Sequence, residues 1–334
     1  MDPARAPTCA PDRTWAIDAA MNRDLSLAIV GASGYAGQVL HALMMHHPCI
    51  EPRVIDAREP DDAALVQCAA CDVVALATPS DAARRWAEIL LRRGHRVLDL
   101  SDAHRLDEGV CYGLPELEGP PTPNTPLVAN PGCYPTAALL ALRPLLKARL
   151  VADDGIAIVG ASGASGAGKG LRADLHFCEL AGNMFPYKVG QHRHTPEIER
   201  YLGAPVSFVT QLLPVTRGML VTAFVRPRAS AAHVLDGLRA AYEMHPWVSV
   251  LPEPGPSLGL RHVVGTHQAL LAVGPQERSG LLPIFSTIDN LMRGAASQAV
   301  HNLNLWLGLS PELGLPPPLA TLPSGLPGMS RMLP

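Results

Sequence analysis

The sequence predicts an α/β protein that begins with a Rossmann-type doubly wound parallel sheet domain and continues into an α+β domain with a mixed sheet. Short aliphatic segments alternate with amphipathic ones in the first part, which is typical of parallel strands covered by helices on both faces. A glycine-rich turn joins the first of these strands to the first helix. Later the chain becomes rich in glycine and serine, and its strand-like segments no longer alternate regularly with helices.

Length and composition agree with two domains and exclude several classes of protein. The 334 residues suggest two domains at about 150 residues each. Acidic residues outnumber basic ones by 30 to 27, and the net charge of −3 argues against a nucleic-acid binder held by phosphate neutralisation. No stretch approaches the roughly 18 apolar residues of a membrane span. With no secretory apolar run near the N-terminus, we expect a soluble cytoplasmic protein that binds neither nucleic acid nor membrane.

The elements of the first domain, residues 25–150, follow from the spacing of its apolar residues. Residues 1–24 are expected to form a disordered or extended lead-in. Continuous aliphatic runs predict buried strands at 25–30, 52–57, 72–77 and 96–100. Helical spacing predicts helices at 36–46, 81–93 and 136–146.

The second domain is expected to comprise residues 151–287. Strand-like segments occur at 155–159, 206–209, 220–225 and 270–273. A helix predicted at 288–307 lies within a segment, 288–309, that returns to the first domain. The tail 310–334 is rich in proline, which disfavours both helix and strand there.

The turn Gly31–Gly37 has the spacing of a dinucleotide-binding turn. Its glycines allow the backbone to approach a pyrophosphate, which free N–H groups at the helix N-terminus can bind. The alternative is a turn that only packs the helix on the strand, but its place between a strand and a helix favours binding. After the next strand, Asp56 would bind a ribose hydroxyl of NAD, whereas Arg58 would bind the 2′-phosphate of NADP. We expect cofactor contacts from Gly31, Ser33, Gly34, Tyr35, Ala36, Gly37 and Arg58.

Two further patterns resemble a phosphate-binding loop and a metal-binding cysteine pair. Gly163 to Lys169 fits the G-x-x-x-x-G-K phosphate loop, but Gly170 stands where a magnesium-binding Ser or Thr is required. This stretch therefore predicts a flexible loop over a ligand rather than ATP or GTP hydrolysis. Cys68 and Cys71 form a lone C-x-x-C without a second pair of ligands, so we expect no metal site.

Cys133 is a candidate nucleophile because it follows an Asn-Pro-Gly turn at the predicted start of a helix. The helix N-terminus favours a thiolate, and a thiolate attacks acyl carbons. The alternative is a buried structural cysteine. His192 and His194 provide proton-transfer partners, with Glu197 close enough in sequence to orient one of them. The alternatives for the histidines are a metal pair, which lacks a third ligand, or solvated surface residues.

Eight motifs, in order from Leu25 to Leu309, resemble the N-acetyl-γ-glutamyl-phosphate reductases, relatives of aspartate-semialdehyde dehydrogenase that use NADPH in arginine biosynthesis. They are GASGYAG (31–37), DLSDAHR (99–105), YGLPEL (112–117), NPGCYPTA (130–137), SGASGAGK (162–169), HFCE (176–179), HRHTPEIE (192–199) and IDNLMRGAASQAVHNLN (288–304). Each motif alone has low specificity, but the ordered set is highly specific.

The resemblance implies a chemistry. Cys133 would attack an acyl phosphate and expel inorganic phosphate, NADP(H) would reduce the resulting thioester to an aldehyde, and His192 or His194 would transfer protons. The second domain would be catalytic and would hold a dimer or tetramer together. The remaining residues that the resemblance implies are Arg105, Asn130 and Glu197 for the substrate, and Ser162, Gly163 and Asn290 for the cofactor.

Two alternatives stay open at this point. A sister reductase would act on N-acetyl-aminoadipyl phosphate, because one extra methylene changes little in a pocket, or on aspartyl phosphate, which the YGLPE and HRHTPEI stretches disfavour. A non-catalytic NADP-binding regulator would have kept the fold without the reaction.

Overall fold

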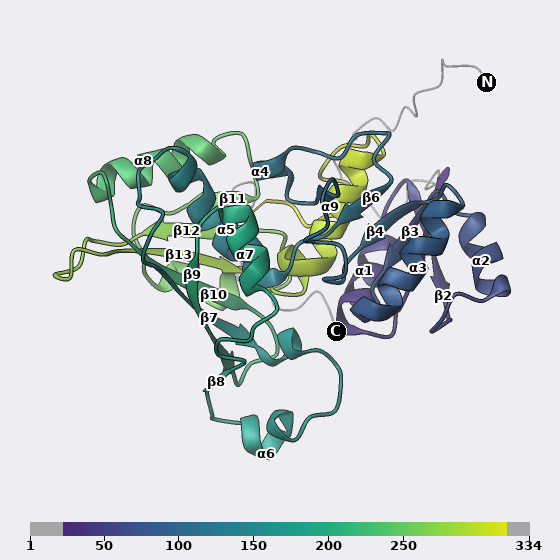
Figure 1. Ribbon diagram of the computed structural model, residues 1–334, viewed down its shortest axis with the longest axis horizontal. Helices are drawn as coiled ribbons and strands as arrows, with labels where there is room; N and C mark the ends of the chain where they lie inside the picture. The colour runs from purple at the N-terminus through teal and green to yellow at the C-terminus, as the bar shows by residue number, and fades with distance from the viewer. Residues whose placement is uncertain (1–22, 319–334) are drawn as a thin grey trace.

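The computed structural model describes residues 23–318, which form two sheets with their helices (Figure 1). The predicted lead-in and most of the proline-rich tail lie outside the described residues. The chain passes from the first sheet to the second and then returns, because the last helix, α9 (Ser297–Trp306), packs against the first sheet. Among the described residues, no helix combines the length and the apolar character needed to cross a membrane.

The first sheet has six parallel strands in the order β2-β1-β3-β4-β6-β5. All four residues of β3 are buried, as are the last four of β1, which explains their continuous aliphatic sequences. This arrangement confirms the predicted parallel sheet. The strands are β1 (Leu25–Val30), β2 (Ile50–Ile55), β3 (Val73–Leu76), β4 (Arg96–Asp99), β5 (Cys111–Tyr112) and β6 (Leu127–Ala129).

Helices cover both faces of this sheet. One face packs against α1 (Tyr35–Met45) and α9 (Ser297–Trp306), and the other against α2 (Asp62–Ala69) and α3 (Ser80–Arg92). The helix predicted at 288–307 is wrong in its first half. The Asp289 carboxylate accepts hydrogen bonds from the backbone N–H groups of Leu291 and Met292, and this turn precedes a π-helical turn at Met292–Ala296.

The second sheet is mixed, as predicted, with the order β11-β12-β13-β10-β7-β9-β8. β7 pairs in parallel with β9, and β11 with β12, whereas the other pairs are antiparallel. β7 continues through residues 160–163, beyond the strand predicted at 155–159. The strands are β7 (Ile156–Gly163), β8 (Phe185–Tyr187), β9 (Val206–Leu213), β10 (Met219–Val225), β11 (Val248–Val250), β12 (Ala269–Val273) and β13 (Leu282–Ile288).

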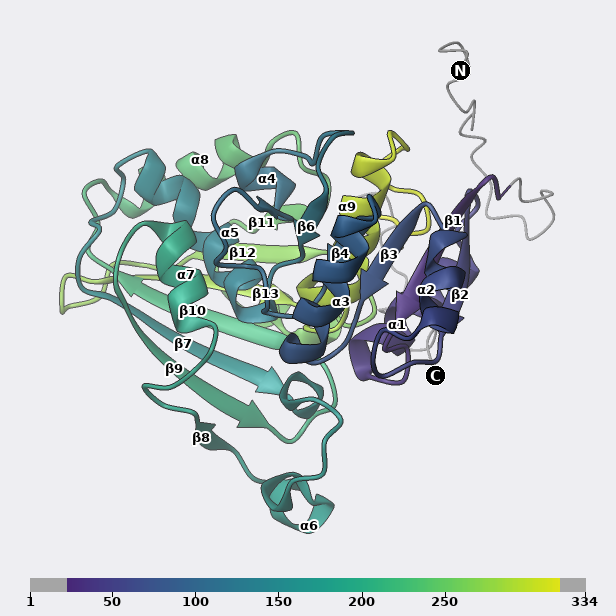
Figure 2. The same cartoon turned by 45° about the vertical axis from the view of Figure 1, so that its right-hand side comes forward.

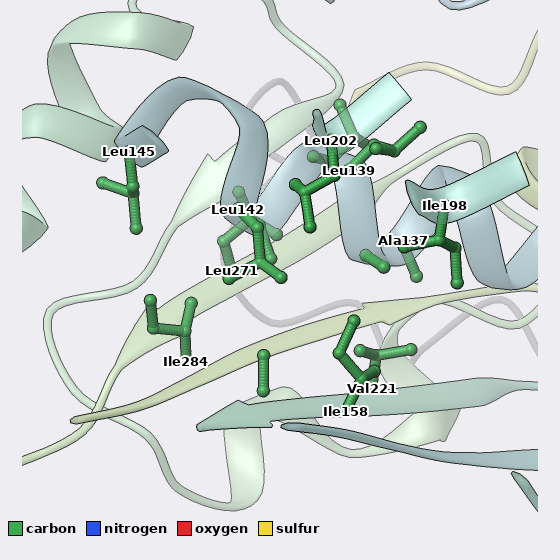
Figure 3. Close-up of a cluster of buried hydrophobic side chains, with 14 of the residues drawn as sticks. Ala137, Leu139, Leu142, Leu145, Ile158, Ile198, Leu202, Val221, Leu271 and Ile284 are labelled. Atoms are coloured by element: carbon green, nitrogen blue, oxygen red, sulfur yellow. The ribbon is translucent and has the colours of Figure 1, made fainter. Parts of the chain in front are cut away.

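One face of the second sheet carries α5 (Cys133–Lys147), α7 (Thr195–Leu202) and α8 (Ala231–Tyr242). Figure 3 shows leucines of α5 directed at Leu271 and Ile284 of the sheet. Because α5 packs here, the structural boundary between the two parts lies before Cys133, earlier than the expected 150. Two short helices, α4 (Pro115–Glu118) and α6 (Phe177–Leu180), lie in connecting segments.

The opposite face of the second sheet is only partly covered. A segment at 256–263 packs on β12 and β13 through Leu258 and Val263. Over β7, β9 and β10, side chains alternate between buried and partly exposed positions, so every second residue faces away from the helices. Figure 2 shows the helices gathered on one side of these strands. We call this surface the open face; its apolar residues include Val159, Val209, Leu220 and Phe224.

The first residues of the predicted tail are docked rather than free. The Asn304 side-chain amide donates to the carbonyls of Pro311 (3.2 Å) and Leu313 (2.8 Å). Its oxygen accepts from Nε2 of His47 (2.9 Å), because Nδ1 of that ring already accepts two backbone N–H groups. These bonds hold the end of the described chain against the first sheet without helix or strand, as the prolines predicted.

Candidate active site

The predicted nucleophile Cys133 is the first residue of α5, next to a glycine that is packed tightly on every side. A Cβ atom on Gly132 would lie 2.5 Å from Nε2 of His194 and 2.8 Å from Nη1 of Arg105. The Gly132 N–H also donates to Oε1 of Glu197 (2.9 Å). The structure therefore gathers the predicted cysteine, histidine, arginine and glutamate around Gly132, a residue that we had not assigned to the site.

Arg105 and Glu197 form a buried ion pair at 3.1 Å, and both are occupied by protein groups. Arg105 also donates from Nε to the Asn130 carbonyl (2.8 Å) and from Nη2 to the Leu100 carbonyl (2.9 Å). Glu197 also accepts from the Tyr112 hydroxyl (2.8 Å). These contacts fix the loop that carries Gly132 and Cys133, and the expected roles of both side chains toward the substrate stay predictions.

Asn130 corrects one expectation. Its amide donates to the Ala295 carbonyl and its oxygen accepts from the Asn302 amide, each at 3.0 Å, and the residue is fully buried. These bonds tie the cysteine loop to the π-helical turn and α9 rather than presenting Asn130 to a ligand. The same turn presses on the nucleophile, because a Cβ atom on Gly294 would lie 2.6 Å from Cβ of Cys133.

The two histidines lie together, with ring centroids 4.9 Å apart. The backbone N–H of His194 donates to Nδ1 of His192 (3.2 Å). The ring of His192 also makes edge-on contacts with the rings of Tyr134, Tyr187 and Phe208. Nε2 of His194 lies 3.5 Å from Nη1 of Arg105, and its buried Nδ1 has no partner in the part of the chain that the structure describes. His194 is thus the imidazole beside the Gly132–Cys133 peptide.

Burial opposes the thiolate that the helix start favours at Cys133. Burial raises the pKa of Cys133 to about 11, although the charge of Arg105 and the Tyr134 N–H oppose this shift. The side chain nevertheless keeps a partly exposed surface, which a substrate needs. Burial lowers the pKa of His192 to about 4, and burial together with Arg105 holds the pKa of His194 well below its usual value. At neutral pH the site holds a thiol and two neutral imidazoles.

The glycine turn fits a pyrophosphate. A Cβ atom on Gly31 (φ +85°) would lie 2.6 Å from the Ala77 carbonyl oxygen, and one on Gly37 only 2.4 Å from the Gly31 oxygen. Beside Gly34, by contrast, the nearest atom is 3.7 Å away, and no side chain caps the N-terminus of α1. Packing therefore requires glycine at positions 31 and 37, whereas a side chain at position 34 would make only ordinary contacts with the turn. Ser33, Tyr35, Asp56 and Arg58 are exposed around this turn and beyond β2, whereas Ala36 is half-buried.

The residues expected to reach the cofactor from the second domain hold a loop instead. Asn290 accepts from the Gly218 N–H (2.8 Å) and donates to Oγ of Ser165 (2.9 Å). Ser162 is buried at the end of β7, and Gly163 packs against the backbone of residues 216–217. Their observed role is to anchor the base of the loop 164–170.

Comparisons with known proteins agree with this geometry. Residues 55–122 match the model of the semialdehyde dehydrogenase NAD binding domain, and residues 133–290 match that of the semialdehyde dehydrogenase dimerisation domain. The N-acetyl-γ-glutamyl-phosphate reductase of Geobacillus sp. (strain WCH70) is 34% identical, over 87% of this chain and 98% of that protein. The corresponding protein of Desulforudis audaxviator is 37% identical, again over 87% and 98%.

The chain belongs to the N-acetyl-γ-glutamyl-phosphate reductase family. This confirms the resemblance that the eight motifs indicated, and with it a family of NAD(P)-binding oxidoreductases.

Solved structures show the same fold at lower identity. Aspartate semialdehyde dehydrogenase II of Vibrio cholerae aligns with a TM-score of 0.67 and 19% identity, over 85% of this chain and 98% of that one. The Candida albicans aspartate semialdehyde dehydrogenase, solved with NADP, aligns with a TM-score of 0.63 and 17% identity, over 85% and 99%. The dimerisation model starts at Cys133, where the structure places the boundary between the two parts of this reductase.

Proposed function

We propose that this chain reduces N-acetyl-L-glutamyl 5-phosphate to N-acetyl-L-glutamate 5-semialdehyde and inorganic phosphate with NADPH, in arginine biosynthesis. The relatives' names support the reaction, and one observation carries it for this chain. A partly exposed cysteine stands at the start of α5, and His194 and Arg105 both lie so close to the preceding Gly132 that a Cβ atom there would be 2.5 and 2.8 Å from them. That is the arrangement of an acyl-transfer site, with a nucleophile, a base and a fixed positive charge.

The first half of the reaction forms a thioester on Cys133. As the sulfur attacks the acyl carbon, its proton passes to the neutral imidazole of His194 and then to the leaving phosphate, and the bond between acyl carbon and phosphate oxygen breaks. We assign this transfer to His194 because Nδ1 of His192 is occupied by a backbone N–H. The positive charge of Arg105 stabilises the charge that develops on sulfur and on phosphate. Glu197 and Asn130 hold the loop in place.

The second half releases the aldehyde. NADPH, when bound at the Gly31–Gly37 turn, supplies a hydride to the acyl carbon. The oxyanion that results collapses, the carbon–sulfur bond breaks, and the sulfur takes up a proton from solvent through His194. Arg58 lies just beyond β2, where its positive charge would bind the 2′-phosphate of NADPH. Asp56, two residues earlier, would instead bind a ribose hydroxyl of NADH.

The decisive experiment follows NADP reduction with N-acetyl-L-glutamate 5-semialdehyde and phosphate. We expect Cys133→Ser to lose nearly all turnover while its Kd for NADPH is unchanged. His194→Asn should lose about 100-fold or more in kcat, the range of general acid–base catalysis, and His192→Asn less. Normal turnover by Cys133→Ser refutes the mechanism. A higher kcat/KM for the aspartyl or aminoadipyl analogue assigns a sister substrate, and NADPH binding without any turnover identifies a regulator.

We also propose that the chain works as a homo-oligomer, a dimer or tetramer, whose copies meet at the open face. The match to a dimerisation domain and the apolar residues that the open face leaves partly exposed support this. The outermost strand of this sheet, β8, belongs to the segment 168–191, in which Leu171 and Phe177 are exposed by 103% and 82%. A cytoplasmic location stays a prediction.

A further inference from the structure

Lys169 connects the second part of the molecule to the glycine turn of the first. It lies in the loop that follows β7, and its ammonium group donates a hydrogen bond to the Ser33 carbonyl (3.0 Å). These residues are 136 positions apart in sequence. Ser33 stands two residues before the first helical residue of α1, so the ammonium group lies beside the N-terminus of that helix.

The Ser33 carbonyl binds the ammonium group, but the helix beside it opposes a positive charge at this place. Unpaired N–H groups give a helix N-terminus a partial positive charge, which repels an ammonium group. Among residues 23–318, Lys169 forms no ion pair with a carboxylate that would offset this repulsion. The N-terminus of α1 also has no side-chain cap, and a Cβ atom on Gly34 would make only ordinary contacts, 3.7 Å or more from the nearest atoms. Two sources of positive charge thus converge on the N-terminus of α1.

The loop around Lys169 has a fixed base and an open tip. At the base, Ala164 donates to the Val215 carbonyl (2.8 Å) and Asn290 donates to Ser165 (2.9 Å). At the tip, Cβ atoms on Gly168 and Gly170 would meet no atom within 4 Å. The tip can therefore adjust its position over a ligand while the base stays in place.

We propose that Lys169 binds the pyrophosphate of the dinucleotide and closes the 164–170 loop over it. On binding, the ammonium group leaves the Ser33 carbonyl for a phosphate oxygen, which α1 approaches with its free N–H groups from the other side. This role does not depend on the chemistry at Cys133, only on dinucleotide binding at the Gly31–Gly37 turn. It gives a function to the lysine of the G-x-x-x-x-G-K pattern without nucleotide hydrolysis.

The test is direct binding of NADPH and of NADH, measured by the fluorescence of the reduced nicotinamide. We expect Lys169→Gln to raise both Kd values by about tenfold, the effect of one lost charge-assisted hydrogen bond. Lys169→Arg should restore binding to within about threefold, because it keeps the charge. The matched control is Lys147→Gln, which removes an exposed lysine at the far end of α5 and should leave both values unchanged.

Hydrogen exchange provides a second readout. In the wild type, NADPH should slow exchange in the 164–170 loop, and in Lys169→Gln it should not. Unchanged Kd values in Lys169→Gln overturn the proposal. So does a loss confined to NADPH, which would assign Lys169 to the 2′-phosphate, and so does equal loop protection in both proteins. Since every readout is binding, a failure here is distinct from a failure of the proposed reaction.

Discussion

At the level of single residues, the sulfur of Cys133 shows how two opposing effects are weighed. A helix N-terminus contributes about 0.3–1 kcal/mol to a charged group, whereas moving a pKa by one unit takes about 1.4 kcal/mol. The helix start therefore cannot offset the burial that raises the pKa of Cys133 to about 11. Position in the helix was readable from the sequence, but burial was not. Deprotonation must accompany attack, which is why a neutral base next to Gly132 matters.

The raised pKa of Cys133 predicts that this residue is alkylated slowly, and with a strong dependence on pH, in the free protein. Only the thiolate reacts with iodoacetamide, so the rate should keep rising with pH toward about 11 and be low at pH 7. The exposed Cys178 serves as an internal control, because peptide mass spectrometry reads both residues in one sample. A rate at Cys133 that levels off below pH 8 would mean that the thiolate already exists in the free site.

The sequence motifs predicted which residues belong to the site better than they predicted which groups those side chains bind. Cys133, His194 and Arg105 were found from motifs and meet at Gly132. Asn130 and Asn290 were assigned to ligands, yet each bonds to protein groups; the Asn130 oxygen bonds to Asn302, 172 positions away. A polar side chain near a motif can bind either a ligand or another group of the protein, and only the fold decides which of the two lies next to it.

At the level of elements, the π-helical turn at Met292–Ala296 is the feature that sequence patterns missed. The apolar spacing of 288–307 resembles one long helix, but Asp289 caps the chain early and the turn follows. Such turns often occur at functional sites. Here the turn brings Gly294 against Cys133 and offers the Ala295 carbonyl to Asn130.

We therefore predict that Gly294→Ala impairs catalysis without impairing cofactor binding. The added methyl would lie 2.6 Å from Cβ and 3.0 Å from Cα of Cys133, so that the nucleophile must shift. A displacement of about 1 Å can lower the rate about 100-fold, and we expect kcat to fall by about 10–100-fold with an unchanged Kd for NADPH. Gly255→Ala is the matched control, because its Cβ meets no atom within 4 Å. Full activity in Gly294→Ala would show that the turn does not position Cys133.

At the level of the whole molecule, the site forms where the two sheets meet. The glycine turn Gly31–Gly37 belongs to the first sheet, whereas Cys133 and the histidines lie on elements that pack with the second sheet. The chain returns to the first sheet through α9 (Figure 1). Alternating strands and helices predicted four of the six strands of the first sheet, whereas the short strands β5 and β6 and the helix α2 were not predicted. The helix α5 packs on the second sheet rather than the first, because chain order does not reveal which sheet a helix covers. The mixed order of the second sheet has long-range pairings that local patterns cannot predict.

The open face is the surface at which we expect two copies of the chain to meet. Val159 lies on β7, between β9 and β10, and its side chain faces away from the helices. If a second copy covers this surface, Val159→Glu buries two unpaired carboxylates at the contact, which costs several kcal/mol. Light scattering should then show a multiple of 35.4 kDa for the wild type and 35.4 kDa for Val159→Glu.

Val66→Glu, which changes an exposed valine of α2 in the first part, should keep the wild-type mass. An unchanged NADPH Kd in Val159→Glu shows that the variant is folded, and an unchanged mass in that folded variant would place the contact elsewhere.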